Sequence, residues 1–266
     1  MQSTLLRRTE QCFADVGITS PRLDAELLMA QAMGVERSYL HAHSEERLDD
    51  ATRQRFEQLV ARRLKREPLA YIVGHKEFYG REFAVTPDVL IPRPETERLI
   101  EFVLRNIALG ATILEVGTGS GAIAITLALE LAKSQVTATD ISASAITLAK
   151  KNANSLSAVM TLTQSDLLNS VSGKFDLIVA NLPYVDPDWP ASPETRFEPA
   201  LALFADDNGL ALIKRLMLQA TKHLPIGGTL LLELDTRQLT ETMAFAEHHG
   251  YSVTETGPFL LALKKL

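Results

Sequence analysis

The order of hydrophobic and polar positions along the chain predicts a helical first part and an alternating second part. Residues 1–66 carry apolar positions at helical spacing, as in Phe56, Leu59, Val60 and Leu64. From residue 112 onward, short apolar runs alternate with amphipathic segments, which indicates strands and helices in turn. The pattern therefore predicts a small helical region followed by a larger α/β region.

The apolar runs of the second part predict a parallel sheet. Ile113–Val116 and Asp176–Ala180 are almost continuously apolar, as is typical of strands that are covered by helices on both faces. We therefore expect a doubly wound α/β domain. Its predicted strands are 112–116, 136–139, 159–163, 175–180, 229–234, 251–255 and 259–263, and its predicted helices are 121–132, 143–153, 208–223 and 237–249.

The region between the two parts is rich in β-prone residues and glycine. Leu69–Gly74 and Glu77–Val85 are short runs of this kind, which predicts a β-hairpin, and Pro94 then begins a helix. We expect a helical recognition domain at 1–68, a hairpin linker at 69–92 and a larger α/β domain at 93–266. The helical part is too small to bury much surface alone, which favours a docking role.

Composition is that of an ordinary globular protein, with 46% hydrophobic and 23% charged residues among 266. The single Cys12 excludes an internal disulfide, and the six scattered histidines form no metal-ligand cluster, which favours metal-free chemistry in a reducing compartment. The first residues do not resemble a signal peptide, and no apolar run reaches the length of a membrane span. We expect a cytoplasmic protein without a membrane association.

Charge is unevenly distributed between the two parts. Acidic and basic residues balance within residues 1–75, so the net charge of −6 falls on the rest of the chain. Proteins that act on nucleic acid usually present a basic surface to the phosphates. The charge distribution therefore weighs against a nucleic acid as the direct substrate.

A glycine-rich turn follows the first predicted strand of the α/β part. Gly117, Gly119 and Gly121 lie between that strand and a helix, where a bare backbone can approach a ligand closely. Asp140 ends the next strand and is placed to bind ribose hydroxyls. Because Gly117, Gly119 and Ala122 also fit a dinucleotide fingerprint, the turn alone predicts only a nucleoside cofactor.

A second motif, Asn181-Leu-Pro-Tyr184, follows the fourth predicted strand at the edge of the sheet where ligands bind. Together with the glycine turn it resembles the class I methyltransferases that alkylate planar nitrogens with S-adenosylmethionine. The Asn181 side-chain oxygen and the Leu182 carbonyl can each accept one N–H of an acceptor NH₂ group, which fixes its plane. Tyr184 is expected to stack on the acceptor and to face the cationic methyl.

Further segments resemble the release factor glutamine methyltransferase (PrmC/HemK) family. They are Glu67–Gly74, Glu77-Phe-Tyr, Val89–Glu97 with its Pro-Arg-Pro-Glu-Thr-Glu sequence, and Arg196-Phe-Glu-Pro199. The resemblance implies N5-methylation of the glutamine in the Gly-Gly-Gln motif of peptide chain release factors. It also implies that the helical part helps to grip the release factor.

The resemblance implies a set of site residues. Expected cofactor contacts are Glu115, Gly117, Thr118, Gly119, Ser120, Gly121, Asp140, Asp166, Leu167 and Asn181. Expected catalytic and substrate-binding residues are Asn181, Leu182, Pro183 and Tyr184, and Arg93 and Glu95 are further substrate-binding candidates. The chain departs from the family pattern at Leu182, where proline is usual, and at Leu167, where an aromatic residue is common.

Two alternatives remain open from the residues. Asn181–Tyr184 is also similar to the tetrapeptide of adenine dimethyltransferases that act on ribosomal RNA, so adenine-N6 methylation of RNA or DNA is a second hypothesis. A methyltransferase-like binding protein without turnover is a third. A dinucleotide oxidoreductase ranks last, because no histidine, cysteine or Tyr-x-x-x-Lys lies where a hydride site needs it.

Overall fold

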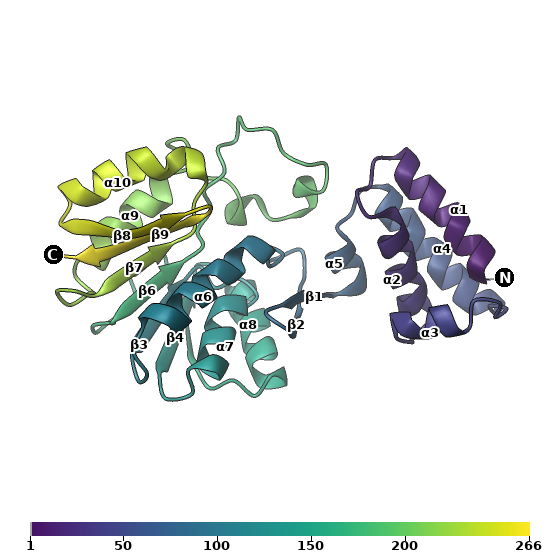
Figure 1. Cartoon of the computed structure of the whole chain (residues 1–266), viewed down its shortest axis with the longest axis horizontal. Helices are drawn as coiled ribbons and strands as arrows, with labels where there is room; N and C mark the ends of the chain where they lie inside the picture. The colour runs from purple at the N-terminus through teal and green to yellow at the C-terminus, as the bar shows by residue number, and fades with distance from the viewer. Residues whose placement is uncertain (1) are drawn as a thin grey trace. The chain divides into compact units, whose positions relative to one another are not determined.

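The computed structural model describes residues 2–266 and divides the chain into two compact units. The first unit runs to His75 and also contains the distant segment Ser192–Phe197, and the second contains Lys76–Ala191 and Glu198–Leu266. Elements of the first unit are α1 (Gln2–Asp15), α2 (Pro21–Met33), α3 (Arg37–Ala42), α4 (Asp50–Leu64), α5 (Leu69–Val73) and the short 3₁₀ helix η2 (Thr195–Phe197) (Figure 1).

Helix ends in the first unit follow local sequence signals. Pro21 occupies the first turn of α2, and Gly34 ends that helix in the left-handed conformation. The Asp49 carboxylate caps α4 by accepting the Thr52 N–H at 2.7 Å. The helices enclose a core of fully buried apolar side chains that includes Phe13 and Phe56.

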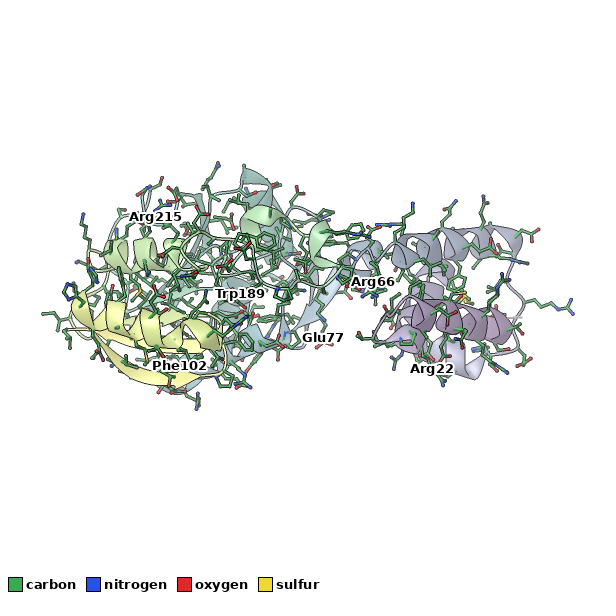
Figure 2. The ribbon with its side chains drawn as sticks, turned by 90° about the horizontal axis from the view of Figure 1, so that it is seen from above. Arg22, Arg66, Glu77, Phe102, Trp189 and Arg215 are labelled. Carbon is green, nitrogen blue, oxygen red and sulfur yellow. The ribbon has the colours of Figure 1, made fainter. Side chains whose placement is uncertain are left out.

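The segment Ser192–Phe197 is joined to the helices of its unit by charged groups. Glu194 accepts hydrogen bonds from Arg66 at 2.8 and 2.9 Å and from Arg63 at 3.2 Å. Arg63, which is almost fully buried, also donates to Asp24 at 2.7 Å. Arg66 is among the side chains labelled in Figure 2. Helix α4 and the residues directly after it therefore fix a segment that follows the Asn181–Tyr184 motif in the chain.

The expected β-run at Leu69–Gly74 is wrong, because Leu69–Val73 is the short helix α5. Pro68 precedes its first turn, and Gly74 ends it with φ of 86°, so a proline start and a glycine stop override the β-prone composition. The predicted hairpin itself is present, formed by β1 (His75–Phe78) and β2 (Arg81–Ala84).

The second unit is built on a seven-stranded sheet of order β5-β4-β3-β6-β7-β9-β8. The first five strands in this order are parallel, and β9 is antiparallel to both of its neighbours, β7 and β8, so that the sheet is mixed. The strands are β3 (Thr112–Val116), β4 (Gln135–Asp140), β5 (Thr161–Gln164), β6 (Leu177–Ala180), β7 (Thr229–Leu232), β8 (Tyr251–Gly257) and β9 (Leu260–Lys265).

Helices cover both faces of this sheet, which confirms the predicted doubly wound fold (Figure 1). Ile113 packs on the face of α6 and α7, whereas its neighbour Leu114 packs on the face of α9 and α10. Both faces are apolar, so the strands are apolar at nearly every position. The helices are η1 (Pro94–Thr96), α6 (Glu97–Asn106), α7 (Ala122–Glu130), α8 (Ala143–Ser155), η3 (Ala200–Ala202), α9 (Ala211–Ala220), η4 (Thr236–Gln238) and α10 (Leu239–His248).

No helix among residues 2–266 is long and apolar enough to cross a membrane.

Candidate active site

The order of the strands brings the two motifs together. From β3 the chain moves outward to β4 and β5 and then returns to the other side of β3 as β6, which makes the β3–β6 boundary a topological switch point. Val116 pairs with Ala180 across this boundary, so Gly117 and Asn181 follow at the same level. The glycine turn and the Asn181–Tyr184 motif therefore meet at the carboxyl edge of the sheet.

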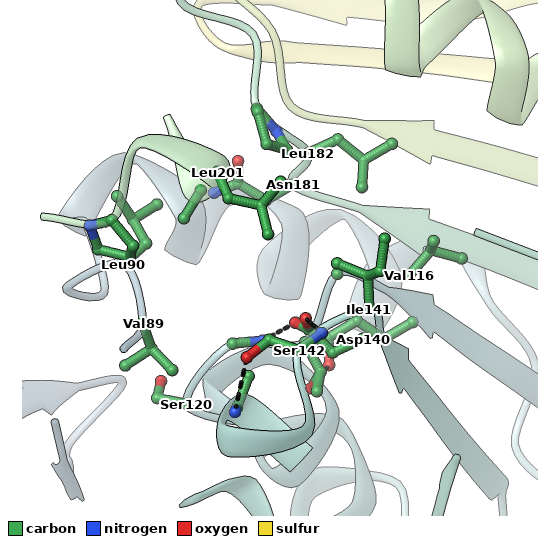
Figure 3. Close-up of a pocket in the computed structure, with 18 of the residues that line it drawn as sticks. Val89, Leu90, Val116, Ser120, Asp140, Ile141, Ser142, Asn181, Leu182 and Leu201 are labelled. Atoms are coloured by element: carbon green, nitrogen blue, oxygen red, sulfur yellow. Dashed lines mark hydrogen bonds between the residues drawn. The ribbon is translucent and has the colours of Figure 1, made fainter. Parts of the chain in front are cut away.

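A cavity of about 520 Å³ opens at this edge, a size typical of small-molecule sites. Figure 3 shows Asn181 and Leu182 across the cavity from Asp140 and Ser142. The cavity is lined by most of the predicted site residues, namely Arg93, Glu115, Gly117, Thr118, Gly119, Ser120, Asp140, Asp166, Leu167, Asn181, Leu182 and Pro183. Among the described residues, the predicted Glu95, Gly121 and Tyr184 lie outside this lining.

The glycines of the turn are required by backbone conformation and by close packing. Gly117, Gly119 and Gly121 all have positive φ, of 80°, 55° and 85°. A Cβ on Gly117 would lie 2.9 Å from the Leu182 Cδ2, and one on Gly121 would lie 2.7 Å from the Ile125 Cδ1. Gly117 thus leaves room for the Leu182 side chain at the cavity wall, whereas Gly121 allows α7 to begin against its neighbours.

Glu115 and Thr118 bind each other beneath the glycine turn. The Glu115 carboxylate is buried and accepts hydrogen bonds from the Thr118 hydroxyl at 2.5 Å and from the Ala124 N–H at 3.0 Å. Burial raises the pKa of Glu115 to about 8, an effect that these two bonds oppose. Both residues touch the cavity, but their hydrogen bonds also give the turn its shape.

Glu115→Gln is expected to remove a pH dependence of stability. The pKa of Glu115 rises from 4.5 to about 8 on folding, so between these pH values the native protein holds a proton that the unfolded chain has released. The free energy of unfolding of the cofactor-free wild type should therefore fall as pH rises, by about 1.4 kcal/mol per pH unit from this group. Glutamine contributes no such slope.

Urea denaturation at several pH values between about 5 and about 8 measures this difference. The stability of Glu115→Gln should increase relative to wild type across that window. Glu247→Gln, which alters an exposed carboxylate on α10, serves as the control and should follow the wild type. Parallel profiles for wild type and Glu115→Gln would contradict the assignment.

Asp140 lies at the end of β4 on the rim of the cavity. Its two carboxylate oxygens accept N–H bonds from Gly119 and from Ser142, each at 2.9 Å (Figure 3). Burial raises the pKa of Asp140, and these N–H bonds oppose the shift. Because each carboxylate oxygen can accept two hydrogen bonds, Asp140 keeps capacity for further hydrogen-bond donors.

Asp166 and Leu167 follow β5 and form another part of the cavity wall. Asp166 pairs with Arg215 at 2.8 Å, and Arg215 also touches the cavity. Leu167 is buried with φ of 49°, a left-handed conformation that directs its side chain into an apolar cluster with Leu182. Leu167 thus offers an apolar contact to this part of the cavity.

The Asn181 side chain is oriented by a bond to a residue far away in the chain. Its Nδ2 donates to the Thr96 hydroxyl at 3.1 Å, and Thr96 is buried in the 3₁₀ turn η1. The bond assigns the nitrogen to the Thr96 side, so the Asn181 Oδ1 faces the other way as an acceptor. Thr96 was not predicted as a site residue.

Leu182 has a packing role that the sequence does not disclose. Its side chain is buried, with Cδ2 against Gly117 and its other contacts in the apolar cluster below the sheet edge. Leucine therefore links the acceptor motif to the glycine turn by side-chain packing, at a position where proline would fix the backbone angle φ.

Tyr184 is half-buried and lies outside the lining of the cavity. Its hydroxyl donates to the Glu233 carboxylate at 3.2 Å, and its carbonyl accepts the Gln238 Nε2–H at 2.8 Å. Burial raises the pKa of the Tyr184 hydroxyl, and the neighbouring Glu233 raises it further, so the hydroxyl stays protonated. Stacking of Tyr184 on an acceptor remains a prediction.

Arg93 and Glu95 are placed differently. Arg93 touches the cavity and forms an ion pair with the buried Glu198, which also accepts the Ile91 N–H at 3.2 Å. Glu198 thereby connects the Pro-Arg-Pro-Glu-Thr-Glu segment to the segment after Phe197. Glu95 lies near Glu233 and raises the pKa of that carboxyl.

Several residues that line the cavity are not among those predicted from the sequence. They include Val89, Ile141, Ser142 and Leu201. Ile141 and Ser142 follow directly after Asp140, so their position next to a strand end was a usable signal. Leu201 is 61% exposed although apolar, and no local pattern marks it.

Comparisons with known proteins agree with this geometry. Residues 4–74 match the family model described as PrmC N-terminal domain, and residues 95–191 match the one described as Methyltransferase small domain. The chain is 45% identical over 222 residues to the release factor glutamine methyltransferase of Koribacter versatilis, covering 81% of this chain and 79% of that protein. It is 39% identical over 259 residues to that of Aliivibrio fischeri, covering 95% and 91%.

A solved structure shares the fold of about two thirds of the chain. The ribosomal protein L11 methylase from Lactobacillus delbrueckii subsp. bulgaricus superposes with a TM-score of 0.50 at 27% identity, covering 65% of this chain and 80% of that one. The doubly wound sheet, the glycine turn and the cavity beside Asn181 define a class I methyltransferase that uses S-adenosylmethionine. The chain belongs to the release factor glutamine methyltransferase family.

Proposed function

We propose that this protein transfers a methyl group from S-adenosylmethionine to the side-chain amide N5 of the glutamine in the Gly-Gly-Gln motif of peptide chain release factors. The observation that carries the proposal is the orientation of Asn181, whose amide nitrogen is bound to Thr96 at the edge of the cavity. A side-chain oxygen held in this way is an acceptor for an NH₂ group. The names of the relatives point to the same acceptor.

The residues of the cavity fit the cofactor. Gly117 and Gly119 leave the backbone bare beside the cavity, and Asp140 presents a carboxylate with capacity for ribose hydroxyls. Ile141 and Leu167 supply apolar surface for a base. When bound, S-adenosylmethionine supplies an electrophilic methyl group on a sulfonium sulfur.

The chain's own residues prepare the acceptor. An amide nitrogen is a poor nucleophile because its lone pair is delocalised into the carbonyl. We propose that the Asn181 Oδ1 and the Leu182 carbonyl each accept one of its N–H groups, which fixes the plane of the amide and favours a pyramidal nitrogen. The nitrogen becomes acidic only as its new bond to carbon forms, so no base has to remove the proton beforehand, and the proton leaves to solvent.

The helical part, proposed as residues 1–68, grips the release factor, and residues 69–92 connect it to the catalytic part at 93–266. The position of Ser192–Phe197 supports this division of roles. That segment lies eight residues beyond Tyr184, yet it packs with the helices through Glu194 and its two arginines. A cytoplasmic location remains a prediction from the sequence.

The charges near the acceptor motif favour a protein substrate over adenine in a nucleic acid. Glu233 and Asp235 both raise the pKa of Tyr184, and Glu95 lies beside Glu233. Acidic groups at this place repel phosphates rather than neutralise them. The cations of this region that the described chain shows are Arg93, paired with Glu198, and Arg237, paired with Asp235, so neither is left free for a phosphate.

The test is methylation in a purified system. The protein, S-adenosylmethionine and an unmodified release factor are combined, and peptide mass spectrometry locates any added methyl group. We expect a single methyl on the glutamine of Gly-Gly-Gln, and none on a release factor in which that glutamine is replaced by alanine. Methylation of an RNA or DNA oligonucleotide instead would support the adenine hypothesis. Cofactor binding without any transfer would support the non-catalytic one.

A further inference from the structure

Glu233 is a buried carboxylate directly beside the acceptor motif. It follows the apolar strand β7, and its N–H donates to the Ala180 carbonyl at 3.0 Å, which places it at the level of Asn181. The residue is 1% exposed. Within the described part of the chain, its Oε2 has no hydrogen-bond partner. Such a group is costly to bury, so its position calls for a role.

The polar neighbours of Glu233 are residues of the proposed acceptor site. The Tyr184 hydroxyl donates to its Oε1 at 3.2 Å. Burial and the charge of Glu95 raise the pKa of Glu233 to about 7, whereas interactions with Thr96, Tyr184 and Asn181 lower it. Two further charges act on Tyr184: Asp235 raises the pKa of its hydroxyl, and Arg93 lowers it.

The directions of the hydrogen bonds connect Glu233 to Asn181. Asn181 donates to the Thr96 hydroxyl, so the Thr96 oxygen is the acceptor of this bond. The single hydroxyl hydrogen of Thr96 therefore stays available for another acceptor. An ionised carboxylate can only accept, so it draws the hydrogens of both Thr96 and Tyr184 toward itself. A protonated carboxyl can instead donate to Thr96 and compete with Asn181.

Glu115 provides a contrast within the same molecule. It is equally buried, but the Thr118 hydroxyl and the Ala124 N–H satisfy it locally. The role of Glu115 is therefore structural, because these bonds give the glycine turn its shape. Glu233 lacks such local bonds and contacts side chains of the acceptor site instead.

We propose that Glu233 is a positioning residue whose ionised form, through Thr96 and Tyr184, holds Asn181 with its side-chain oxygen toward the methyl acceptor. The inference deepens the proposed function and rests on it for the identity of the acceptor. The dependence of the Asn181 orientation on Glu233 can be measured without a methyl acceptor. Glu233 touches neither cofactor nor substrate in this scheme and acts through its neighbours.

The first test follows the side-chain NH₂ of Asn181 by NMR in ¹⁵N-labelled protein, with the signal identified by its loss in Asn181→Ala. In the wild type we expect the signal to titrate with a midpoint near the Glu233 pKa of about 7. In Glu233→Gln it should be independent of pH over the same range, whereas the surface control Glu247→Gln should titrate like the wild type. An unchanged titration in Glu233→Gln, or none in the wild type, would overturn the proposal.

The second test uses methyl transfer. The kcat of the wild type should fall as pH decreases below about 7, because Glu233 becomes protonated, and Glu233→Gln should lack this limb. Thr96→Val should lower kcat by about 10- to 100-fold, while Thr96→Ser, which keeps the hydroxyl, should stay within about threefold of wild type. Equal activity of Thr96→Val and Thr96→Ser would contradict the connection through Thr96.

The two tests separate this inference from the proposed function. If the wild type does not methylate the release factor, the proposed function fails, and the NMR titration still decides the role of Glu233. If Glu233→Gln does not fold, which thermal denaturation would reveal, the Thr96→Val and Thr96→Ser pair decides it, because Thr96 reports on the same hydrogen bonds.

Discussion

Asn181→Ala is expected to lower kcat for glutamine methylation by about 10³-fold. The substitution removes the oxygen that holds the acceptor amide in its reactive plane. This oxygen contributes to kcat because it orients the amide and does not only bind it. The affinity for S-adenosylmethionine should change by less than about tenfold, because the glycine turn and Asp140 remain in place. Single-turnover kinetics and isothermal titration calorimetry measure the two effects separately.

Two further variants test the reason for this loss. Asn181→Asp keeps a side-chain oxygen but loses the N–H that donates to Thr96, and it adds a charge near Glu233. It should therefore lose nearly as much activity as Asn181→Ala. Asn154→Ala, which removes an exposed amide at the end of α8, should retain wild-type kinetics. Activity of Asn181→Ala within fivefold of the wild type, which corresponds to about 1 kcal/mol of transition-state stabilisation, would exclude the proposed role.

The sequence predicted the elements that local pattern controls. Continuous apolar runs identified β3 and β6, and the rule that ligands bind at the carboxyl ends of parallel strands placed the glycine turn and Asn181 at one site. The register of Val116 with Ala180 then accounts for their proximity. The prediction failed at Leu69–Val73, where capping signals on both sides outweigh β-propensity.

Residues that act through distant partners could not be predicted in this way. Thr96 binds Asn181 from 85 positions away, and Tyr184 binds Glu233 from 49 positions away. Such pairs depend on which strands become neighbours, and the local sequence does not specify that. Glu233 left one signal, since it directly follows the apolar strand Thr229–Leu232 and so lies at the carboxyl end of a parallel strand, where site residues gather.

Leu182 shows how a departure from a family pattern acquires a physical meaning. The sequence indicates only that leucine stands where proline is usual. In the structure its side chain occupies the space in front of Gly117, where even a single added carbon on the glycine would lie 2.9 Å from it. The acceptor motif and the glycine turn are thus packed against each other, so the two motifs are coupled by contact as well as by register.

Gly209→Ala is expected to abolish most of the methyl transfer although Gly209 lies outside the cavity lining. Its φ is 82°, and a Cβ there would lie 2.0 Å from the Tyr184 carbonyl oxygen and 2.6 Å from the Gln238 Nε2. Gln238 is buried and donates to the carbonyls of Tyr184 at 2.8 Å and Asn208 at 2.7 Å. The methyl group cannot be accommodated unless the backbone at Tyr184 moves.

A shift of this backbone displaces the acceptor motif, so kcat should fall by about 100-fold or more. Gly173→Ala is the matched control, because Gly173 also has positive φ, of 94°, but a Cβ there meets nothing within 4 Å. Both variants should lose about 1 to 2 kcal/mol of stability from backbone strain, and only Gly209→Ala should lose activity beyond that effect. Steady-state kinetics and urea denaturation of both variants decide the matter: if they behave alike, Gly209 does not position Tyr184, and the strain of a positive φ accounts for the whole change.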